Sequence, residues 1–564
     1  MNNYISEALN EIYGKEDNFI IIGLTGKTGS GCTTAAKILA SNKDEISHSL
    51  YQGNTPTKNE QRKEKIIYNY FRENWDEFYI ISASAVITLL WALNFEDNNG
   101  KEFLYKFIFR NRRIFKNKNL LSNNEEYGIN PLIKKMELQL KKILKALTSQ
   151  NVIDFYTKEI QDVNDKIKKI LGTDIYIQLY QAFGKNIRLS GNVYSEKQNK
   201  GSFFTVSKKI NEIIEEIRSV TENKKTFIVI DALRNPLEAF YFQKRYSAFY
   251  LIAINCEETQ RKNRLINLNL TDKEIQSISK NEYTDKPLNK IDGFISQNIP
   301  ACLQKADIYI NNNDAPDEVG KFKNLANQLI RIITLIKKPG LVTPTFQEIC
   351  MQIAYTAKLN SGCISRQVGA VVTDENYSLK SIGWNDTPHG QVPCNLRNRN
   401  DLLNGYDTEA YSFYEKNNSE FIMCFKKNTE KYQNITADIN FNYCFKDEFN
   451  ILKQKANQVH TRALHAEENA FLQISKYGGM GINGGILFTT ASPCELCAKK
   501  AYQLGISKIY YIDPYPGISE EHILQAGNMP PEMILFSGAI GRAFHQLYSP
   551  IIPYKDELSN YKCG

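Results

Sequence analysis

The residues best suited to chemistry lie in two short motifs of the C-terminal part of the sequence. His465-Ala466-Glu467 is followed later by Pro493-Cys494-Glu495-Leu496-Cys497. One imidazole and two thiolates suit Zn²⁺, a borderline-soft ion. Three protein ligands leave a fourth position for water, which is the arrangement of catalytic zinc sites. Because two residues separate the cysteines, one helical turn presents both sulfur atoms to one ion. We therefore predict a catalytic zinc site formed by His465, Cys494 and Cys497.

Glu467 is better placed for proton transfer than for ligation. Zinc lowers the pKa of a bound water from about 15.7 to roughly 7. The carboxylate would take a proton from that water and pass it to the ring nitrogen and then to the leaving ammonia. The order H-x-E…P-C-x-x-C is the signature of zinc deaminases, in which hydroxide attacks C4 of cytosine. A structural zinc site and a chance match stay as alternatives, because an isolated C-x-x-C is common in structural zinc sites.

The elements that must position these motifs alternate between strands and helices. Residues 33–41 and 132–147 have helical patterns, and residues 75–95 resemble a buried strand followed by a helix. Alternation of this kind predicts a mainly parallel α/β sheet. Prolines and a glycine near residue 340 indicate a junction between domains 1–340 and 341–564. The apolar runs typical of buried strands are 19–25, 226–230, 249–255 and 306–310.

Length, charge and cysteine content limit the class of protein. A chain of 564 residues predicts two to four domains. The net charge of +8 is uneven: residues 340–564 hold 20 Lys+Arg and 22 Asp+Glu, which leaves +10 for residues 1–339. The basic half fits contact with phosphates or RNA, or a merely solvated lysine-rich surface. The longest apolar stretch, Ile80–Phe95, is shorter than the ~20 residues of a membrane span. Eleven cysteines, an odd number, favour a reducing cytosol over a disulfide framework.

Several ordered blocks in the C-terminal half resemble the deoxycytidylate deaminase family. Ser361–Asp374 and Ile382–Pro388 are similar to its S-x-C…R-x-V-G-A-V and G-Y-N-G-x-P blocks, with Trp384 in place of the usual tyrosine. The resemblance covers about Phe346–Pro516 and implies a cytidine-deaminase-like α/β/α layer. It also implies that Asn385 contacts the sugar or phosphate and that Arg366 shapes the nucleotide site. Without the resemblance, Asn385 is equally a turn residue and Arg366 a surface charge.

The same resemblance raises a second metal site. Some phage-type members carry a structural zinc bound by cysteine and histidine. Cys363 and Cys394 match cysteines of that pattern, and His460 is a further candidate. Because each cysteine is equally an ordinary buried thiol, the sequence leaves a second zinc open.

A glycine-rich loop in the N-terminal half has the context of a P-loop, since it follows a strand and opens a helix. The position of the phosphate-binding lysine holds Cys32, which argues against an efficient kinase. Asp231–Pro236 resembles the D-G-x-R-N segment of nucleotide-kinase-like proteins, and we expect Arg261 and Arg264 to form a lid-like basic patch. Nucleotide sensing is favoured, with a scaffold or an active kinase as alternatives. The predicted nucleotide-binding residues are Gly26, Lys27, Gly29, Gly31, Cys32 and Thr33.

A P-loop kinase-like domain before a deoxycytidylate-type deaminase is similar to one bacterial group, the anti-phage dCTP/dCMP deaminases. The run Leu535–Leu558 resembles that group as well. The resemblance implies deamination of free dCTP and dCMP in the cytoplasm during phage infection. It further implies a second nucleotide at the P-loop, a small regulatory RNA and a homo-oligomer.

Three other functions stay open. A deaminase of bases within RNA or DNA shares the zinc signature, but the slightly acidic C-terminal half lacks the expected basic channel. A nucleotide sensor with a non-catalytic deaminase domain would have no need of Glu467. A nucleotide kinase with an accessory domain is weakened by Cys32.

Overall fold

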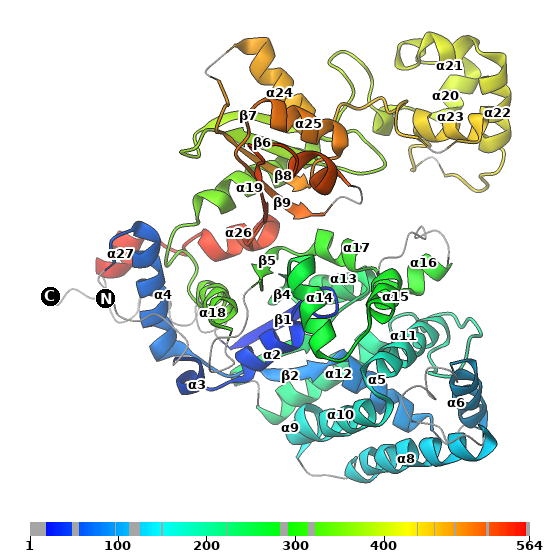
Figure 1. The fold of residues 1–564 in the computed structure, drawn as a ribbon, viewed down its shortest axis with the longest axis vertical. Coiled ribbons are helices and arrows are strands. Elements are labelled where there is room, and N and C mark those ends of the chain that lie inside the picture. The colour runs from blue at the N-terminus through cyan, green and yellow to red at the C-terminus, as the bar shows by residue number, and fades with distance from the viewer. Residues whose placement is uncertain are drawn as a thin grey trace. The chain divides into compact units, whose positions relative to one another are not determined.

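The chain folds into two compact units, Met1–Thr343 with Arg542–Gly564 and Pro344–Gly541 (Figure 1). Within the described part of the chain, no helix is long and apolar enough to cross a membrane. The computed structural model describes residues 18–47, 56–95, 98–111, 125–147, 151–222, 224–282, 291–313, 322–436, 438–455, 457–478, 481–514 and 518–559.

The first unit is built on a parallel sheet with the strand order β5-β4-β1-β3-β2. Consecutive residues of its central strand are buried, so both faces of the sheet are covered, as in other parallel sheets. The apolar runs predicted as strands are confirmed, with small shifts at their ends. The strands are β1 (Phe19–Thr25), β2 (Tyr79–Ser82), β3 (Thr226–Asp231), β4 (Phe249–Asn255) and β5 (Ile308–Asn311).

Helices surround this sheet, and many of them are amphipathic with one buried face. Helix α2 packs against β1, β2 and β3, while α13 and α17 pack against β4. Half of the remaining helices that the structure describes in this unit come from the segment between β2 and β3. The helices up to β3 are α2 (Cys32–Ala40), α3 (Lys43–Ser47), α4 (Asn59–Asn74), α5 (Ala83–Leu93), α6 (Asn98–Arg110), α8 (Glu125–Ala146), α9 (Val152–Asp154), η1 (Phe155–Glu159), α10 (Ile160–Leu171), α11 (Thr173–Ser190) and α12 (Thr205–Val220). After β3 come α13 (Pro236–Arg245), α14 (Glu258–Asn267), α15 (Asp272–Glu282), α16 (Ile291–Ile295), α17 (Ile299–Lys305) and α18 (Lys323–Lys337).

The structure differs from the expectation that residues 341–564 form one domain, because the last segment of the chain packs with the first unit. Arg542–Gly564, with most of α26 (Gly541–Tyr548) and α27 (Tyr554–Ser559), belongs to the first unit. The Gly340 N–H donates to the Leu547 carbonyl at 2.9 Å, and Lys338 pairs with Glu557. The buried residues Ala543 and Leu547 add apolar burial. These contacts join segments some 200 positions apart, which sequence order cannot indicate.

The second unit contains a mixed sheet with the strand order β10-β9-β8-β6-β7. β6 runs antiparallel to β7 and β8, whereas β8, β9 and β10 run parallel. A shorter strand, β11, follows the sheet. The strands are β6 (Gly369–Thr373), β7 (Leu379–Trp384), β8 (Ile486–Ala491), β9 (Lys508–Asp513), β10 (Glu532–Leu535) and β11 (Gly538–Ala539).

Helices cover both faces of this second sheet. A Cβ atom at Gly369 would meet the backbone of α19 (Phe346–Ala357), at 2.0 Å from the Ala354 carbonyl oxygen. The next residue, Ala370, packs in a core with Ala466 of α24 (Ala466–Tyr477) and Ala498 of α25 (Glu495–Gln503). Because successive strand residues point to opposite faces, α19 lies on one face and α24 and α25 lie on the other.

A cluster of helices is inserted between β7 and α24, and Figure 1 shows them grouped together. Their core is aromatic and encloses two ion pairs, Arg397–Glu415 and Arg399–Glu448. Arg397 and Glu415 have no exposed side-chain surface, and the Arg397 guanidinium lies 4.5 Å from the Tyr443 ring centroid. The inserted elements are η3 (Cys394–Leu396), α20 (Arg399–Asn404), η4 (Thr408–Ala410), α21 (Phe413–Asn417), α22 (Ser419–Thr429) and α23 (Phe445–Lys453).

We expect the Glu415→Ala substitution to lower the free energy of unfolding by about 3–5 kcal/mol, because it leaves the buried Arg397 charge without its partner. Urea unfolding of the full chain measures the loss. Glu420→Ala is the matched control, since Glu420 of the same insert is 68% exposed and should cost less than about 1 kcal/mol. Equal losses for the two variants would show that the buried pair does not hold the insert together.

Candidate active site

The two sequence motifs meet at the N-terminal ends of α24 and α25. His465 immediately precedes α24, Cys494 immediately precedes α25, and Cys497 lies in the first turn of α25. The His465 Nδ1 atom is 3.2 Å from the Cys494 Sγ atom and 3.4 Å from the Cys497 Sγ atom. Tetrahedral zinc with bonds of about 2.1 Å to nitrogen and 2.3 Å to sulfur would separate these atoms by about 3.5 Å. The three side chains therefore fit a zinc ion in both chemistry and spacing.

No other group in the described segments meets the same criterion for a metal site. The ligand atoms of His465, Cys494 and Cys497 lie within 4.8 Å of one another, and this is the only set of three or more His, Cys, Asp or Glu side chains found there. The structure does not bring Cys363, Cys394 and His460 into such a group. His460 instead lies on the Phe449 ring, with the ring centroids 4.3 Å apart.

The two thiols differ in acidity. Hydrogen bonds from Cys497 and His465 lower the pKa of the Cys494 thiol to about 3, although burial opposes the shift. The contact with Cys494 and burial raise the pKa of Cys497. The hydrogen bond to Cys494 likewise raises the pKa of His465. Cys494 is thus the more acidic of the two thiols, and it lies at a helix start, where the backbone dipoles favour a thiolate.

Glu467 lies beside the three predicted ligands but does not belong to that group. It stands in the first turn of α24 and is only 4% exposed, and burial raises its pKa. The Thr489 hydroxyl of β8 lies 3.3 Å from its Oε1 atom. A buried carboxyl with a raised pKa accepts and releases a proton more readily near neutral pH than an exposed one.

Close packing holds α24 on the sheet. A Cβ atom at Gly383 of β7 would lie 2.2 Å from the Ala466 carbonyl oxygen, so only glycine allows the helix to approach this closely. The Glu468 carboxylate accepts the His465 N–H at 3.4 Å and pairs with Lys500 of α25. This pair joins the two helices that carry the ligands.

The two predicted substrate-binding residues lie in one network. The Asn385 side chain donates to the Arg366 carbonyl at 2.7 Å and accepts the Val368 N–H at 2.6 Å. The Arg366 guanidinium bonds to Asp513, the last residue of β9, at 2.5 Å. Asp386, next to Asn385, pairs with Leu464, which precedes His465. Asn385 therefore fixes the loop that carries Arg366, and contact of either side chain with substrate stays a prediction.

The predicted P-loop lies between β1 and α2. Gly29 and Gly31 have φ values of 91° and 110°, which favour glycine. The Thr33 hydroxyl donates a hydrogen bond at 2.8 Å to the carboxylate of Asp231, which ends the neighbouring strand β3. Cys32 is buried, and burial raises the pKa of its thiol to about 12, so the thiol is neutral. Gly26 and Lys27 complete the loop, and Lys27 pairs with Glu258 at 3.3 Å.

The arginines expected as a lid contact the loop backbone instead. Arg261 is 2% exposed and donates to the Thr28 carbonyl at 3.1 Å. Arg264 donates to the Ser30 carbonyl at 3.3 Å. The sequence did not indicate the partner of Thr28, which is Glu282, because 254 positions separate the two residues.

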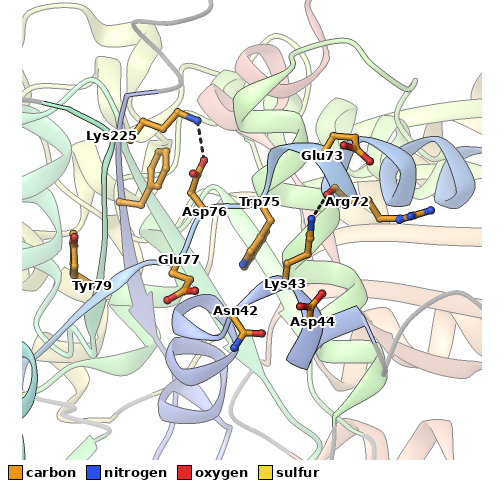
Figure 2. Close-up of a pocket in the computed structure, with 11 residues that line it drawn as sticks. Asn42, Lys43, Asp44, Arg72, Glu73, Trp75, Asp76, Glu77, Tyr79 and Lys225 are labelled. Carbon is orange, nitrogen blue, oxygen red and sulfur yellow. Dashed lines mark hydrogen bonds and ion pairs between the residues drawn. The ribbon is translucent and has the colours of Figure 1, made fainter.

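A polar cavity of about 490 Å³ lies elsewhere in the first unit, at the starts of β2 and β3 (Figure 2). Since the loop before α2 follows the end of a parallel strand, this cavity lies at the opposite edge of the sheet. Lys225 pairs with Asp76 there at 3.2 Å, and Lys43 donates to the Arg72 carbonyl at 2.9 Å. None of the predicted site residues lines it.

Comparison with known proteins agrees with the geometry of the second unit. Residues 344–513 match the family described as the cytidine and deoxycytidylate deaminase zinc-binding region. The deoxycytidylate deaminase of Enterobacteria phage T2 is 29% identical over 175 residues, which cover 29% of this chain and 78% of that protein. The phage T4 deoxycytidylate deaminase is 29% identical over 180 residues, which cover 29% of this chain and 76% of that protein.

Among solved structures, the dCMP deaminase of the cyanophage S-TIM5 in complex with dCMP and dUMP is 25% identical. The match covers 35% of this chain and 99% of the cyanophage chain, and its TM-score is 0.21. The family match, residues 344–513, includes His465, Glu467, Cys494 and Cys497. Residues 344–513 thus form a deaminase domain of the deoxycytidylate type, and the protein is a deoxycytidine nucleotide deaminase.

Proposed function

We propose that this protein hydrolyses the exocyclic amine of free dCMP and dCTP and releases ammonia, with zinc held by His465, Cys494 and Cys497. The observation that carries the proposal is the convergence of these three side chains beside the buried carboxyl of Glu467. A binding module would not need a proton carrier beside the metal ligands.

The chain's own residues divide the work of deamination. Zinc, when bound, would lower the pKa of a water molecule so that hydroxide is available near neutral pH to attack C4 of the base. Glu467 takes one proton from the attacking water and gives it to N3 of the ring. It then takes the proton of the hydroxyl formed at C4 and delivers it to the amine, so that the C4–N4 bond breaks and ammonia leaves. Its burial, with the Thr489 hydroxyl 3.3 Å away, keeps the carboxyl oriented within a water-poor site.

The nucleotide's sugar and phosphate require a second set of contacts. We assign this role to Asn385 and Arg366, because the loop that they form is tied to the end of β9 through Asp513. A guanidinium ion binds a phosphate through charge-assisted hydrogen bonds, which suits Arg366 to that group. In this assignment Arg366 exchanges the Asp513 carboxylate for the phosphate.

A panel of substrates tests the proposal. Zinc-loaded protein is offered dCMP, dCTP, CMP, CTP and a cytosine-containing oligonucleotide, and release of ammonia and formation of the uracil product are measured. We expect turnover of dCMP or dCTP and none of the oligonucleotide. Turnover of the oligonucleotide alone would replace the proposal with a polynucleotide deaminase.

The resemblance to anti-phage dCTP/dCMP deaminases supports a biological role for this activity. The enzyme would drain dCTP and dCMP in the cytoplasm of an infected cell and so limit phage DNA synthesis. The same resemblance supports a homo-oligomer and restraint by a small RNA, for which the basic first unit is a suitable surface.

A second function, binding of a nucleotide by the first unit, is supported by the hydrogen bond from Thr33 to Asp231. It links the start of α2 to a carboxylate of the adjacent strand, beside backbone N–H groups of the kind that bind phosphates. The missing lysine at Cys32 favours sensing or regulation over phosphoryl transfer. Nucleotide binding by the first unit would then control deamination by the second.

A further inference from the structure

The loop that opens α2 already binds an anionic group, the carboxylate of Glu282. Glu282 ends α15, and its side chain has no exposed surface. Its Oε1 atom accepts the Thr28 backbone N–H at 2.9 Å and the Thr28 hydroxyl at 2.5 Å. The same oxygen bonds to the Arg234 guanidinium at 2.5 Å. A backbone amide, a hydroxyl and a guanidinium thus converge on one carboxylate oxygen.

Arg234 supplies a positive charge at this loop, where Cys32 takes the place of the usual phosphate-binding lysine. Its guanidinium comes from the segment after β3, donates to the Thr28 hydroxyl at 2.7 Å, and keeps 26% of its side-chain surface exposed. The Cys32 thiol, in contrast, is buried and neutral. Lys27 forms an ion pair with Glu258 in the same region.

We propose that Thr28 and Arg234 form an oxyanion site for a phosphate group of a nucleoside triphosphate, and that Glu282 is its internal occupant. This inference rests on the proposed binding of a nucleotide by the first unit. Carboxylate and phosphate oxygens accept the same charge-assisted hydrogen bonds, so the Glu282 carboxylate takes the place of the ligand. Because two anions cannot share these donors, the nucleotide must displace the carboxylate. Its apparent affinity is reduced by the fraction of protein in which Glu282 is bound.

The loop distinguishes this pair from an ordinary buried ion pair. The Thr28 N–H that donates to the Glu282 carboxylate lies in a turn shaped by Gly29 and Gly31, both at positive φ. Arg261 also holds this turn, because its guanidinium donates a hydrogen bond to the Thr28 carbonyl. If the pair were only structural, removal of Glu282 would lower stability and would not tighten the binding of any ligand.

Calorimetric titration of the zinc-loaded full chain with ATP, and separately with inorganic tripolyphosphate, tests the proposal. Neither probe carries a cytosine, and any binding of their phosphates at Arg366 is common to all the variants, so differences in affinity between variants report on the first unit. We expect Glu282→Ala to bind both probes on the order of 10-fold more tightly than the unsubstituted protein. Arg234→Ala, added to Glu282→Ala, should remove at least that gain. Asp272→Ala is the matched control on α15, because Asp272 is 64% exposed and pairs with Lys262 instead of the loop before α2.

Each result is decisive for one of the two ideas. If the unsubstituted protein and Glu282→Ala bind ATP equally well, the first unit binds nucleotide but Glu282 is not a competitor. If neither protein binds either probe, nucleotide binding by the first unit fails and the inference fails with it. Glu282→Gln keeps an acceptor oxygen for Thr28 and removes the charge. If Glu282→Ala does not fold, Glu282→Gln replaces it in the titration. We then expect a smaller gain in affinity for ATP and tripolyphosphate.

Discussion

Replacing Glu467 with glutamine is expected to lower kcat for dCMP deamination by about 10²–10⁴-fold while zinc stays bound. The amide has nearly the same shape as the carboxyl but cannot take up a proton and deliver it to the base. Since Glu467 is not among the metal-binding residues, the zinc content of the variant should match that of the unsubstituted protein. Steady-state kinetics and metal analysis of the same preparation measure both quantities.

Glu521→Gln is the matched control for this change, because Glu521 is an exposed carboxylate of the same unit. Its kcat should change by less than about twofold. A Glu467→Gln variant that keeps most of its kcat would show that another group moves the proton. Loss of zinc together with activity would instead place Glu467 in the metal site.

Replacing Cys497 with alanine is expected to remove zinc from the protein and to reduce deamination to background. The remaining ligands, His465 and Cys494, leave two donors where catalytic zinc sites use three. Cys497 is buried in the first turn of α25, and the alanine side chain offers no donor atom to a metal. Metal analysis after dialysis against a weak chelator should give about one zinc per chain for the unsubstituted protein and almost none for the variant.

Cys424→Ala removes a thiol of the insert that lies outside the ligand group and should leave the zinc content unchanged. Retention of zinc and activity by Cys497→Ala would show that this cysteine is not a ligand. Zinc loss without loss of activity would show that the metal serves the fold and not the reaction.

The predicted zinc ligands were accessible to sequence analysis because the spacing within each motif is local. His465 and Glu467 are two positions apart, and Cys494 and Cys497 three, so one helical turn settles the geometry of each motif. The strands of the first unit were accessible for a similar reason. A buried parallel strand is an uninterrupted apolar run, and β1 and β4 begin and end at the residues that the runs predict.

Features that depend on distant pairing were not accessible in this way. The position of Arg542–Gly564 in the first unit follows from contacts such as that between Gly340 and Leu547. Arg261 and Arg264 looked like an exposed lid, since charged residues at helical spacing usually face water, but both contact the backbone of the loop before α2.

The sequence by itself determined the chemistry of this protein: a histidine, two cysteines and a glutamate in an order that few functions other than deamination require. It also determined the alternation of strands and helices, because both signals arise from neighbours within a few residues. Only the tertiary structure decided that Gly340 contacts Leu547, that the Arg397–Glu415 pair lies inside an aromatic insert, and that Glu282 occupies the loop at Thr28. These pairings join residues far apart in the chain, and packing and the burial of charge select them, not local preference.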